Sequence, residues 1–343
     1  MVNGLASELN FLKRGLSGSQ ISGLKGLAEK SADNWWKDVL ESEDLLLAVR
    51  NGYLNAYVKG QSVFKIAFGK GSSDAGQPRL AIHYKYLVKP DLEKKDPYVS
   101  FDGKEFKLDP RTIVNTEYES KLTLPQLIKT AARFAGPEKS GVHKIARNEP
   151  KVIDLEIAFT KAAENGDLSA PRMDIAVLVQ AEPGKAELVF CEAKCADNPE
   201  LWGLEKLPKG VKSHPPSERL TAVIAQVRKY EQFIQTKEIQ ESLIEGYVRV
   251  CMNLVEISEQ SPGRRVDDLV KRVAEGKLEL SIHPHVYLLI YDFGEDEKKG
   301  RIKNKRLELK KAGVRTIAKG DPGAFELAND VVRARTEWTV SSG

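Results

Sequence analysis

The sequence predicts an α/β protein in which a mixed central β-sheet is flanked by helices. Three observations support this fold class. Val152 to Phe159 alternates between apolar and polar residues, as a half-buried strand does. Ile175 to Val179 is continuously apolar, which is typical of a strand buried on both faces. A third strand candidate, Glu187 to Cys195, is followed by helical patterns and then by the apolar run Val286 to Phe293, so strands and helices are interleaved.

The part of the chain that precedes this sheet has a different pattern. Residues 1–40 predict a helical or irregular arm whose Trp35-Trp36 pair docks on the core. Short apolar runs follow, separated by turn signals such as Asn51-Gly52, and they predict an antiparallel meander. These runs are Leu45–Val49, Tyr53–Val58, Val63–Phe68, Arg79–Val88 and Tyr98–Phe106. We therefore divide the chain into residues 1–115, a β-rich region suited to substrate or partner recognition, and residues 116–343, which contain the chemistry.

Helical periodicity recurs in the second part of the chain. The expected helices are Gln126–Ala135, Ser217–Ile234, Lys237–Ile257, Val266–Ala274 and Phe325–Arg335. A loop rich in Pro, Gly and Lys, Ala196 to Pro216, separates the third strand from the next helix. Loops of this length in compact domains are usually functional, so we expect this one to contact or gate a substrate, with His214 close to a phosphate.

Composition limits the class of protein. The chain has 343 residues, of which 41% are hydrophobic and 30% charged, which is the balance of a globular protein. Because no apolar run approaches the roughly 18 residues of a membrane span, we expect no membrane partner. An odd number of cysteines, three, argues against a disulfide framework, and no secretory signal is seen, so we place the protein in the cytoplasm. A phosphate-binding Gly-x-x-x-x-Gly-Lys motif is absent from the sequence, which excludes an autonomous ATP-driven motor.

Charge is concentrated in one short segment. The net charge of +4 is mild, yet Lys298 to Lys311 contains eight Lys or Arg residues and one Glu. Such a concentration suits a phosphate backbone. A solvated basic surface segment is an equally good interpretation, and both are kept open.

The third strand contains an acidic and a basic residue on one face. Side chains two apart on a strand point the same way, so Glu192 and Lys194 lie side by side. If the second and third strands form a hairpin through Glu182-Pro183-Gly184-Lys185, the start of one lies opposite the end of the other. This register brings Asp174 beside Glu192. Without partners, burying such charges costs several kcal/mol, on the order of the penalty for unpaired ionised groups, and a metal ion would remove that conflict.

Carboxylates placed in this way suit a hydrolytic metal site. Phosphodiester hydrolysis needs hydroxide near neutral pH and charge neutralisation on the phosphate, and a divalent ion held by carboxylates supplies both. Mg²⁺ typically accepts one or two protein carboxylates and keeps several waters. We expect Asp174 and Glu192 to bind Mg²⁺, with the Ala193 carbonyl assisting. Lys194 is expected to orient the attacking water and to offset charge on the phosphate.

These motifs resemble those of the PD-(D/E)XK nuclease superfamily. Arg172-Met173-Asp174 is similar to the Arg-x-Asp variant of its first motif, and Glu192-Ala193-Lys194 to its second. Gln226 and Tyr230, one helical turn apart, resemble the Gln-x-x-x-Tyr motif of RecB-like members, although such a Gln also satisfies buried backbone groups elsewhere. The resemblance also implies an upstream acid, for which we select Glu156. Its competitors are Glu117, Glu119, Glu149 and Asp154, and an exposed strand residue is the alternative for Glu156 itself.

The resemblance extends from about Val152 to Phe233, roughly a quarter of the chain, and it implies both a fold and a function. The implied fold is a restriction-endonuclease-like core, and the implied function is Mg²⁺-dependent hydrolysis of DNA, with Mn²⁺ expected to substitute. A role in restriction or phage defence is implied by the resemblance alone, and a homo-oligomer or accessory protein is left open as a partner. Two other functions are kept: a non-catalytic nucleic-acid-binding or scaffold protein on the same fold, and a nuclease that acts on RNA.

Two further clusters are weaker candidates for metal binding. Cys191 and Cys195 face away from Glu192 and have no suitably spaced partners, so we interpret them as buried small residues. His283 and His285 precede a strand, and we interpret them as loop residues.

Overall fold

The computed structural model describes residues 12–71, 74–87, 98–107, 117–159, 171–205 and 220–340. The chain forms two compact units. One consists of Lys13–His143 with Glu245–Leu278, and the other of Met1–Leu12, Lys144–Ile244 and Glu279–Gly343. These bounds do not coincide with the division expected at residue 115, because a later segment of the chain returns to the first unit.

The unit built from Lys13–His143 contains a five-stranded antiparallel sheet in the order β1-β2-β3-β4-β5, which confirms the expected meander. Its strands are β1 (Leu46–Val49), β2 (Leu54–Val58), β3 (Gln61–Phe68), β4 (Pro78–His83) and β5 (Tyr98–Phe101). The strand expected to reach Val88 stops earlier, because Tyr84–Tyr86 forms a turn of 3-10 helix, η2. Helices of this unit are α2 (Gly18–Ala28), α3 (Trp35–Glu41), α4 (Thr123–Ala132) and α9 (Asp268–Ala274). Both Trp35 and Trp36 are buried, as expected.

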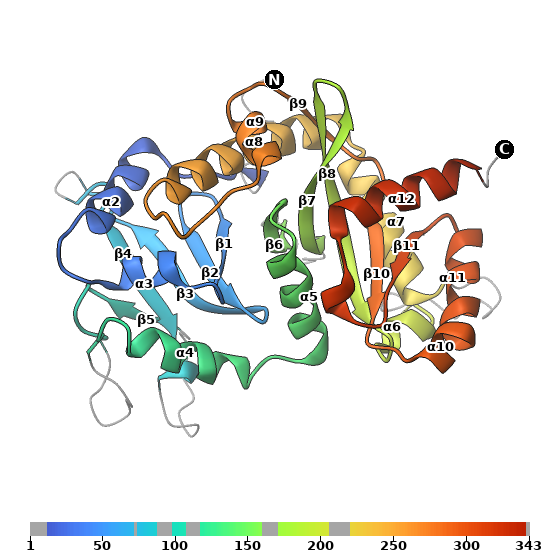
Figure 1. Ribbon diagram of the computed structural model, residues 1–343, viewed down its shortest axis with the longest axis horizontal. Helices are drawn as coiled ribbons and strands as arrows, with labels where there is room; N and C mark the ends of the chain where they lie inside the picture. The colour runs from blue at the N-terminus through green and yellow to red at the C-terminus, as the bar shows by residue number, and fades with distance from the viewer. Residues whose placement is uncertain are drawn as a thin grey trace, which may run out of the picture. The chain divides into compact units, whose positions relative to one another are not determined.

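The other unit contains a mixed sheet in the order β11-β10-β8-β7-β6, with β9 also paired to β8. Its strands are β6 (Val152–Ala158), β7 (Arg172–Glu182), β8 (Lys185–Cys195), β9 (Glu279–Ile282), β10 (Tyr287–Tyr291) and β11 (Arg315–Ala318). β6, β7 and β8 are antiparallel neighbours, whereas β8, β10 and β11 run parallel. The α/β class with a mixed sheet is thus confirmed, and β8 lies in its interior (Figure 1).

Helices cover both faces of this mixed sheet. Gln226 of α7 (Ala222–Ile234) bonds to Glu192, whereas Arg335 of α12 (Leu327–Val340) bonds to Glu187. Since residues 187 and 192 are an odd number of positions apart on β8, they point to opposite faces. α7 and α12 therefore cover opposite faces, and α11 (Arg301–Lys311) packs near the edge strand β11 (Figure 1).

Several elements were not expected from the sequence. They are α5 (Pro137–Asn148), α6 (Pro199–Trp202), α10 (Glu295–Lys299), α11, β9 and β11. Helix α8 (Lys237–Ser258) agrees with expectation. Most of the loop Ala196–Pro216, His214 included, lies outside the described residues. Within those residues, we find no helix that is both long enough and apolar enough to cross a membrane.

Candidate metal centre

The predicted carboxylates lie on the hairpin formed by β7 and β8. Glu182 pairs with Lys185 at the turn, and the ladder continues to Ile175 paired with Cys191. The next position along each strand holds Asp174 and Glu192, so the expected hairpin register is observed. β7 begins at Arg172, and Asp174 therefore lies within the strand rather than just before it.

Asp174 is fixed by the backbone of the neighbouring strand. Its Oδ2 accepts a hydrogen bond from the Ala193 N–H at 2.8 Å. Charge-assisted hydrogen bonds of this kind are stronger than neutral ones. The backbone ladder between β7 and β8 is recorded only as far as Cys191, and beyond it a side chain takes over the pairing. This arrangement holds the Asp174 carboxylate next to Glu192.

Glu192 and Lys194 form a buried ion pair. The Lys194 Nζ lies 2.8 Å from Glu192 Oε1, and the two residues expose only 5% and 3% of their surface. Lys194 also lies 2.8 Å from Glu200 Oε2, on the short helix α6. Burial of an ion pair is favourable only when further hydrogen bonds satisfy its atoms. Such hydrogen bonds come from α7.

Gln226 and Tyr230 complete this network from one face of α7. The Gln226 Nε2 donates to Glu192 Oε1 at 2.9 Å and to the Tyr230 hydroxyl oxygen at 2.8 Å. Burial, reinforced by the negative charge of Glu192, raises the pKa of Tyr230 above its ordinary value, so this phenol stays protonated at neutral pH. The Gln226 Oε1 is buried and has no hydrogen-bond partner among the described residues. An orphaned buried acceptor beside two carboxylates is compatible with an ordered water.

Glu156 has an unusual position on β6. Its neighbours Leu155 and Ile157 pair with Ile175 and Met173, the residues that flank Asp174 on β7. Its backbone has a φ of 51°, which lies in the left-handed region that non-glycine residues rarely adopt. Asp154, one of its competitors, is fully buried.

The donor set fits a hard divalent cation with few protein ligands. Among the described residues, no group of three or more His, Cys, Asp or Glu side chains is arranged to hold a metal ion, so Glu156 is not gathered with Asp174 and Glu192 into such a group. Asp174 and Glu192 occupy neighbouring positions on β7 and β8, where the Ala193 N–H bonds to Asp174. Two carboxylates match the usual requirement of Mg²⁺, which keeps several of its waters.

Glu200 was missed from the sequence although it contacts Lys194. The signal that predicts its helix is Asn198-Pro199: the Asn198 side chain accepts from the Glu200 N–H at 2.8 Å, and Pro199 occupies the first turn. α6 is only four residues long, too short for a periodic pattern. A helix start so close to a strand end places its first acidic residue back over that strand.

The cysteine and histidine candidates lie in surroundings that need no metal ion. Cys191 is buried, and its burial together with the charges of Asp174 and Glu192 raises the pKa of its thiol. His283 Nδ1 lies 3.0 Å from the carbonyl oxygen and 3.2 Å from the nitrogen of the His285 backbone, and His285 Nδ1 lies 3.1 Å from Glu231.

Comparison with known proteins adds no relative: no family model, curated protein or solved structure matches the chain.

Proposed function

We propose that this chain is a Mg²⁺-dependent nuclease that hydrolyses phosphodiester bonds of DNA, on a restriction-endonuclease-like core of the PD-(D/E)XK type. The observation that carries the proposal is the linkage of Glu192 to Lys194 and Gln226, at 2.8 and 2.9 Å, beside Asp174. Strands β7 and β8 and helix α7 each contribute to this group. Its residue types and spacing are those of the superfamily motifs. A role in restriction or phage defence, with an accessory protein or second copy, follows from the resemblance alone.

Two carboxylates and one carbonyl would hold the metal ion. These are Asp174, Glu192 and the Ala193 carbonyl, with Glu156 as an upstream acid whose contribution has to be measured. When bound, Mg²⁺ lowers the pKa of a water and neutralises charge on the phosphate. Mn²⁺, which also prefers oxygen ligands, is expected to substitute.

The remaining side chains would orient and neutralise the reacting groups. The Lys194 ammonium carries three N–H donors, so it can hold Glu192 and still donate to an attacking water or to a phosphate oxygen. Gln226 fixes the direction of the Glu192 carboxylate. Tyr230 in turn fixes Gln226, and because its pKa is raised, it acts as a hydrogen-bonding group and not as a base.

Cleavage assays with isosteric variants test this function. The purified chain is incubated with linear and circular DNA, single- and double-stranded, in Mg²⁺ or Mn²⁺. We expect cleavage that chelation abolishes and that Asp174→Asn and Lys194→Met each reduce by about a hundredfold or more, the range for a lost transition-state group. Lys185→Ala is the matched control, because Lys185 lies on the same strand at its exposed end. Undiminished cleavage by Asp174→Asn would overturn the assignment.

Metal binding separates the proposed function from its alternatives. Calorimetric titration with Mn²⁺ should show binding to the unaltered chain. Because Glu192→Gln removes a charged ligand, it should bind Mn²⁺ at least tenfold more weakly, a loss of roughly 1.4 kcal/mol. If no Mn²⁺ binds and no DNA is cut, a non-catalytic binding or scaffold role replaces the nuclease. Parallel RNA substrates identify an RNA-directed enzyme, because only RNA offers a 2′-hydroxyl.

A further inference from the structure

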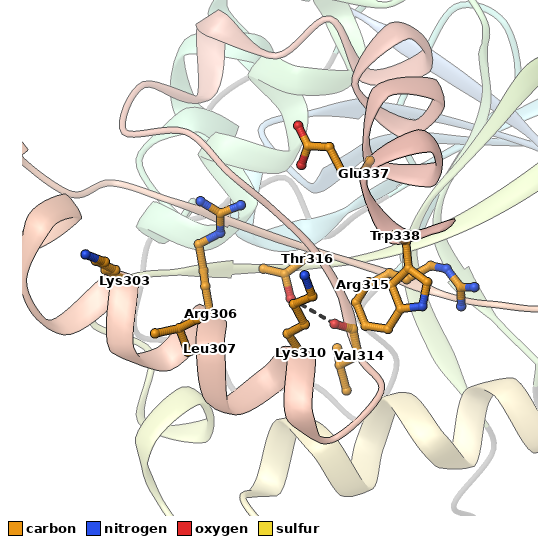
Figure 2. Close-up of a pocket in the computed structure, with 10 residues that line it drawn as sticks. Lys303, Arg306, Leu307, Lys310, Val314, Arg315, Thr316, Glu337 and Trp338 are labelled. Atoms are coloured by element: carbon orange, nitrogen blue, oxygen red, sulfur yellow. Dashed lines mark hydrogen bonds between the residues drawn. The ribbon is translucent and has the colours of Figure 1, made fainter. Parts of the chain in front are cut away.

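A recessed basic pocket lies between helix α11, strand β11 and helix α12, outside the candidate metal centre. It encloses about 260 Å³. Figure 2 shows the side chains that surround it. Those side chains come from three segments: Lys303, Arg306, Leu307 and Lys310 of α11; Val314, Arg315 and Thr316 at β11; and Ala334, Glu337 and Trp338 of α12. All of them belong to one compact unit.

The periodicity of α11 explains why its cations gather at this pocket. Residues three and four apart share one face of a helix, so Lys303, Arg306 and Lys310 form a single row. An adjacent side of the helix buries Ile302 and Leu309. The helix therefore places Lys303, Arg306 and Lys310 of the basic run at the pocket.

The cations of the pocket differ from their neighbours on α11 because the structure shows no close ion pair for them among the described residues. Elsewhere on α11, Arg301 bonds to Asp197 and Glu297, and Lys305 lies 2.7 Å from Glu308. Within the described part of the chain, no ion pair is recorded for the four cations that line the pocket: Lys303, Arg306, Lys310 and Arg315. One carboxylate, Glu337, is found among the lining residues. The pocket thus has a marked excess of positive charge.

An aromatic ring and an exposed aliphatic side chain give the same pocket an apolar part. The Arg315 guanidinium carbon lies 5.2 Å and the Lys310 Nζ 6.0 Å from the centre of the Trp338 ring, and Figure 2 shows the ring between them. Cation–π contact of this kind holds a flexible cation in place. Leu307, which also lines the pocket, exposes 51% of its surface. Desolvation also lowers the pKa of Arg315, so a bound anion would offset the cost of burying its charge.

We propose that this pocket binds single-stranded nucleic acid, with backbone phosphates on Lys303, Arg306, Lys310 and Arg315 and one base against Leu307 and Trp338. Proteins that bind single strands combine a cationic groove with an aromatic surface for bases, and both are present here. A recess of about 260 Å³ accepts a splayed base, whereas a duplex keeps its bases stacked and presents only its backbone. The proposal needs no cleavage, so it stands or fails independently of the proposed nuclease activity.

Binding by matched charge variants provides the test. A fluorescein-labelled oligothymidylate of about 15 nucleotides is titrated with the full chain in EDTA, which excludes metal-dependent cleavage, and anisotropy is followed at several salt concentrations. The double variant Arg306→Ala/Lys310→Ala is expected to bind about tenfold or more weakly, and its slope of log affinity against log salt should fall by about 1.4. The control, Lys299→Ala/Lys311→Ala, removes two charges from the same basic run at exposed residues that do not line the pocket.

Each remaining outcome has a defined meaning. The proposal is supported if the control loses less than threefold in affinity and both double variants unfold at the temperature of the unaltered chain. An equal loss of affinity in the two double variants would assign binding to diffuse surface charge and overturn the proposal. Quenching of intrinsic fluorescence by the oligonucleotide should disappear in Trp338→Phe, which leaves the other three tryptophans in place. Three further results would overturn the proposal. They are equal affinity for a duplex of the same length, higher affinity for tripolyphosphate than for the oligonucleotide, and no binding by the unaltered chain.

Discussion

The side-chain amide of Gln226 donates a hydrogen bond to Glu192 across 2.9 Å, although 34 positions separate the two residues in the chain. One lies on α7 and the other on β8, so this bond fixes the helix over the face of the strand that presents the ion pair. A carboxylate that is held by both an ammonium and an amide has a defined orientation. That orientation is what a ligand to a metal ion needs.

Removal of the Gln226 amide should weaken the fold and the site together. Gln226→Ala is expected to lower the free energy of unfolding by about 1.5–3 kcal/mol, because hydrogen bonds to charged groups contribute that much. The exposed Gln232 on the same helix is the control, and Gln232→Ala should change it by less than about 0.5 kcal/mol. Urea unfolding of both variants measures the difference, and equal values would show that the Glu192 contact contributes nothing.

The two carboxylate partners of Lys194 should differ greatly in their importance. Lys194→Ala deprives the buried Glu192 of its ammonium partner and is expected to cost about 3–5 kcal/mol. Glu200→Ala removes a carboxylate whose side chain is 52% exposed, and such pairs contribute about 1 kcal/mol or less. Thermal and denaturant unfolding rank the two variants. A larger loss for Glu200→Ala would contradict the buried pair as the dominant contact.

Backbone strain at Glu156 can be tested because glycine should have opposite effects on stability at two positions of β6. Because its φ is 51°, a glycine there avoids the cost of about 1 kcal/mol that a side chain bears in this region. We expect Glu156→Gly to be more stable than Glu156→Ala by about that amount. At the exposed Ala158, where φ is not positive, Ala158→Gly should instead destabilise by about 0.5–1 kcal/mol. If glycine lowered the free energy of unfolding relative to alanine at both Glu156 and Ala158, backbone strain at Glu156 would be contradicted.

Stability should fall in acid because of His283. Burial is the main cause that lowers the pKa of this imidazole to about 4, against about 6.5 when unfolded. The unfolded chain therefore binds more protons between those pH values, so the free energy of unfolding decreases as pH falls from about 6.5 to 4 and levels off below that. The resulting loss of unfolding free energy is on the order of 3 kcal/mol.

A histidine variant isolates this effect from other titrating groups. Glu187, Arg335 and Arg315 also act on His283, the first favouring its protonation and the two arginines opposing it. As pH decreases from about 6.5 to 4, the unaltered chain should lose unfolding free energy relative to His283→Asn. His285→Asn serves as the control, since it retains the backbone N–H and carbonyl that contact the His283 ring. A difference that does not change with pH would contradict the lowered pKa.

Much of the mixed sheet is predictable because its strands are either alternating or continuously apolar. Glu182 to Lys185 combines Pro and Gly between two apolar runs, and this fixes both the turn and the register of β7 against β8. The short strands β9 and β11 have four residues each, too few for a periodic pattern to be distinct. Helix α5 is polar along most of its length, and its apolar stripe is limited to Val142, Ile145 and Ala146, which is a short signal for helix prediction.

The geometry of the candidate site is predictable to a lesser extent. Strand parity places Glu192 beside Lys194, and helical spacing places Gln226 beside Tyr230, since both depend on local geometry. The positive φ of Glu156 is not predictable from the sequence, because no glycine marks the position. The contact of Lys194 with Glu200 depends on the path of the short connection between β8 and α6. Local pattern carries no information about that.

The hydrogen bond from the Ala193 N–H to Asp174 makes a backbone proton into a reporter of the carboxylate. In a nitrogen–proton correlation spectrum, the resonance of this single amide should move when Asp174 is protonated, and again when a cation draws electron density from its oxygens. Selective ¹⁵N-alanine labelling would make it observable without substitution of any site residue. The state of the carboxylate can then be followed in the unaltered chain, with or without a substrate.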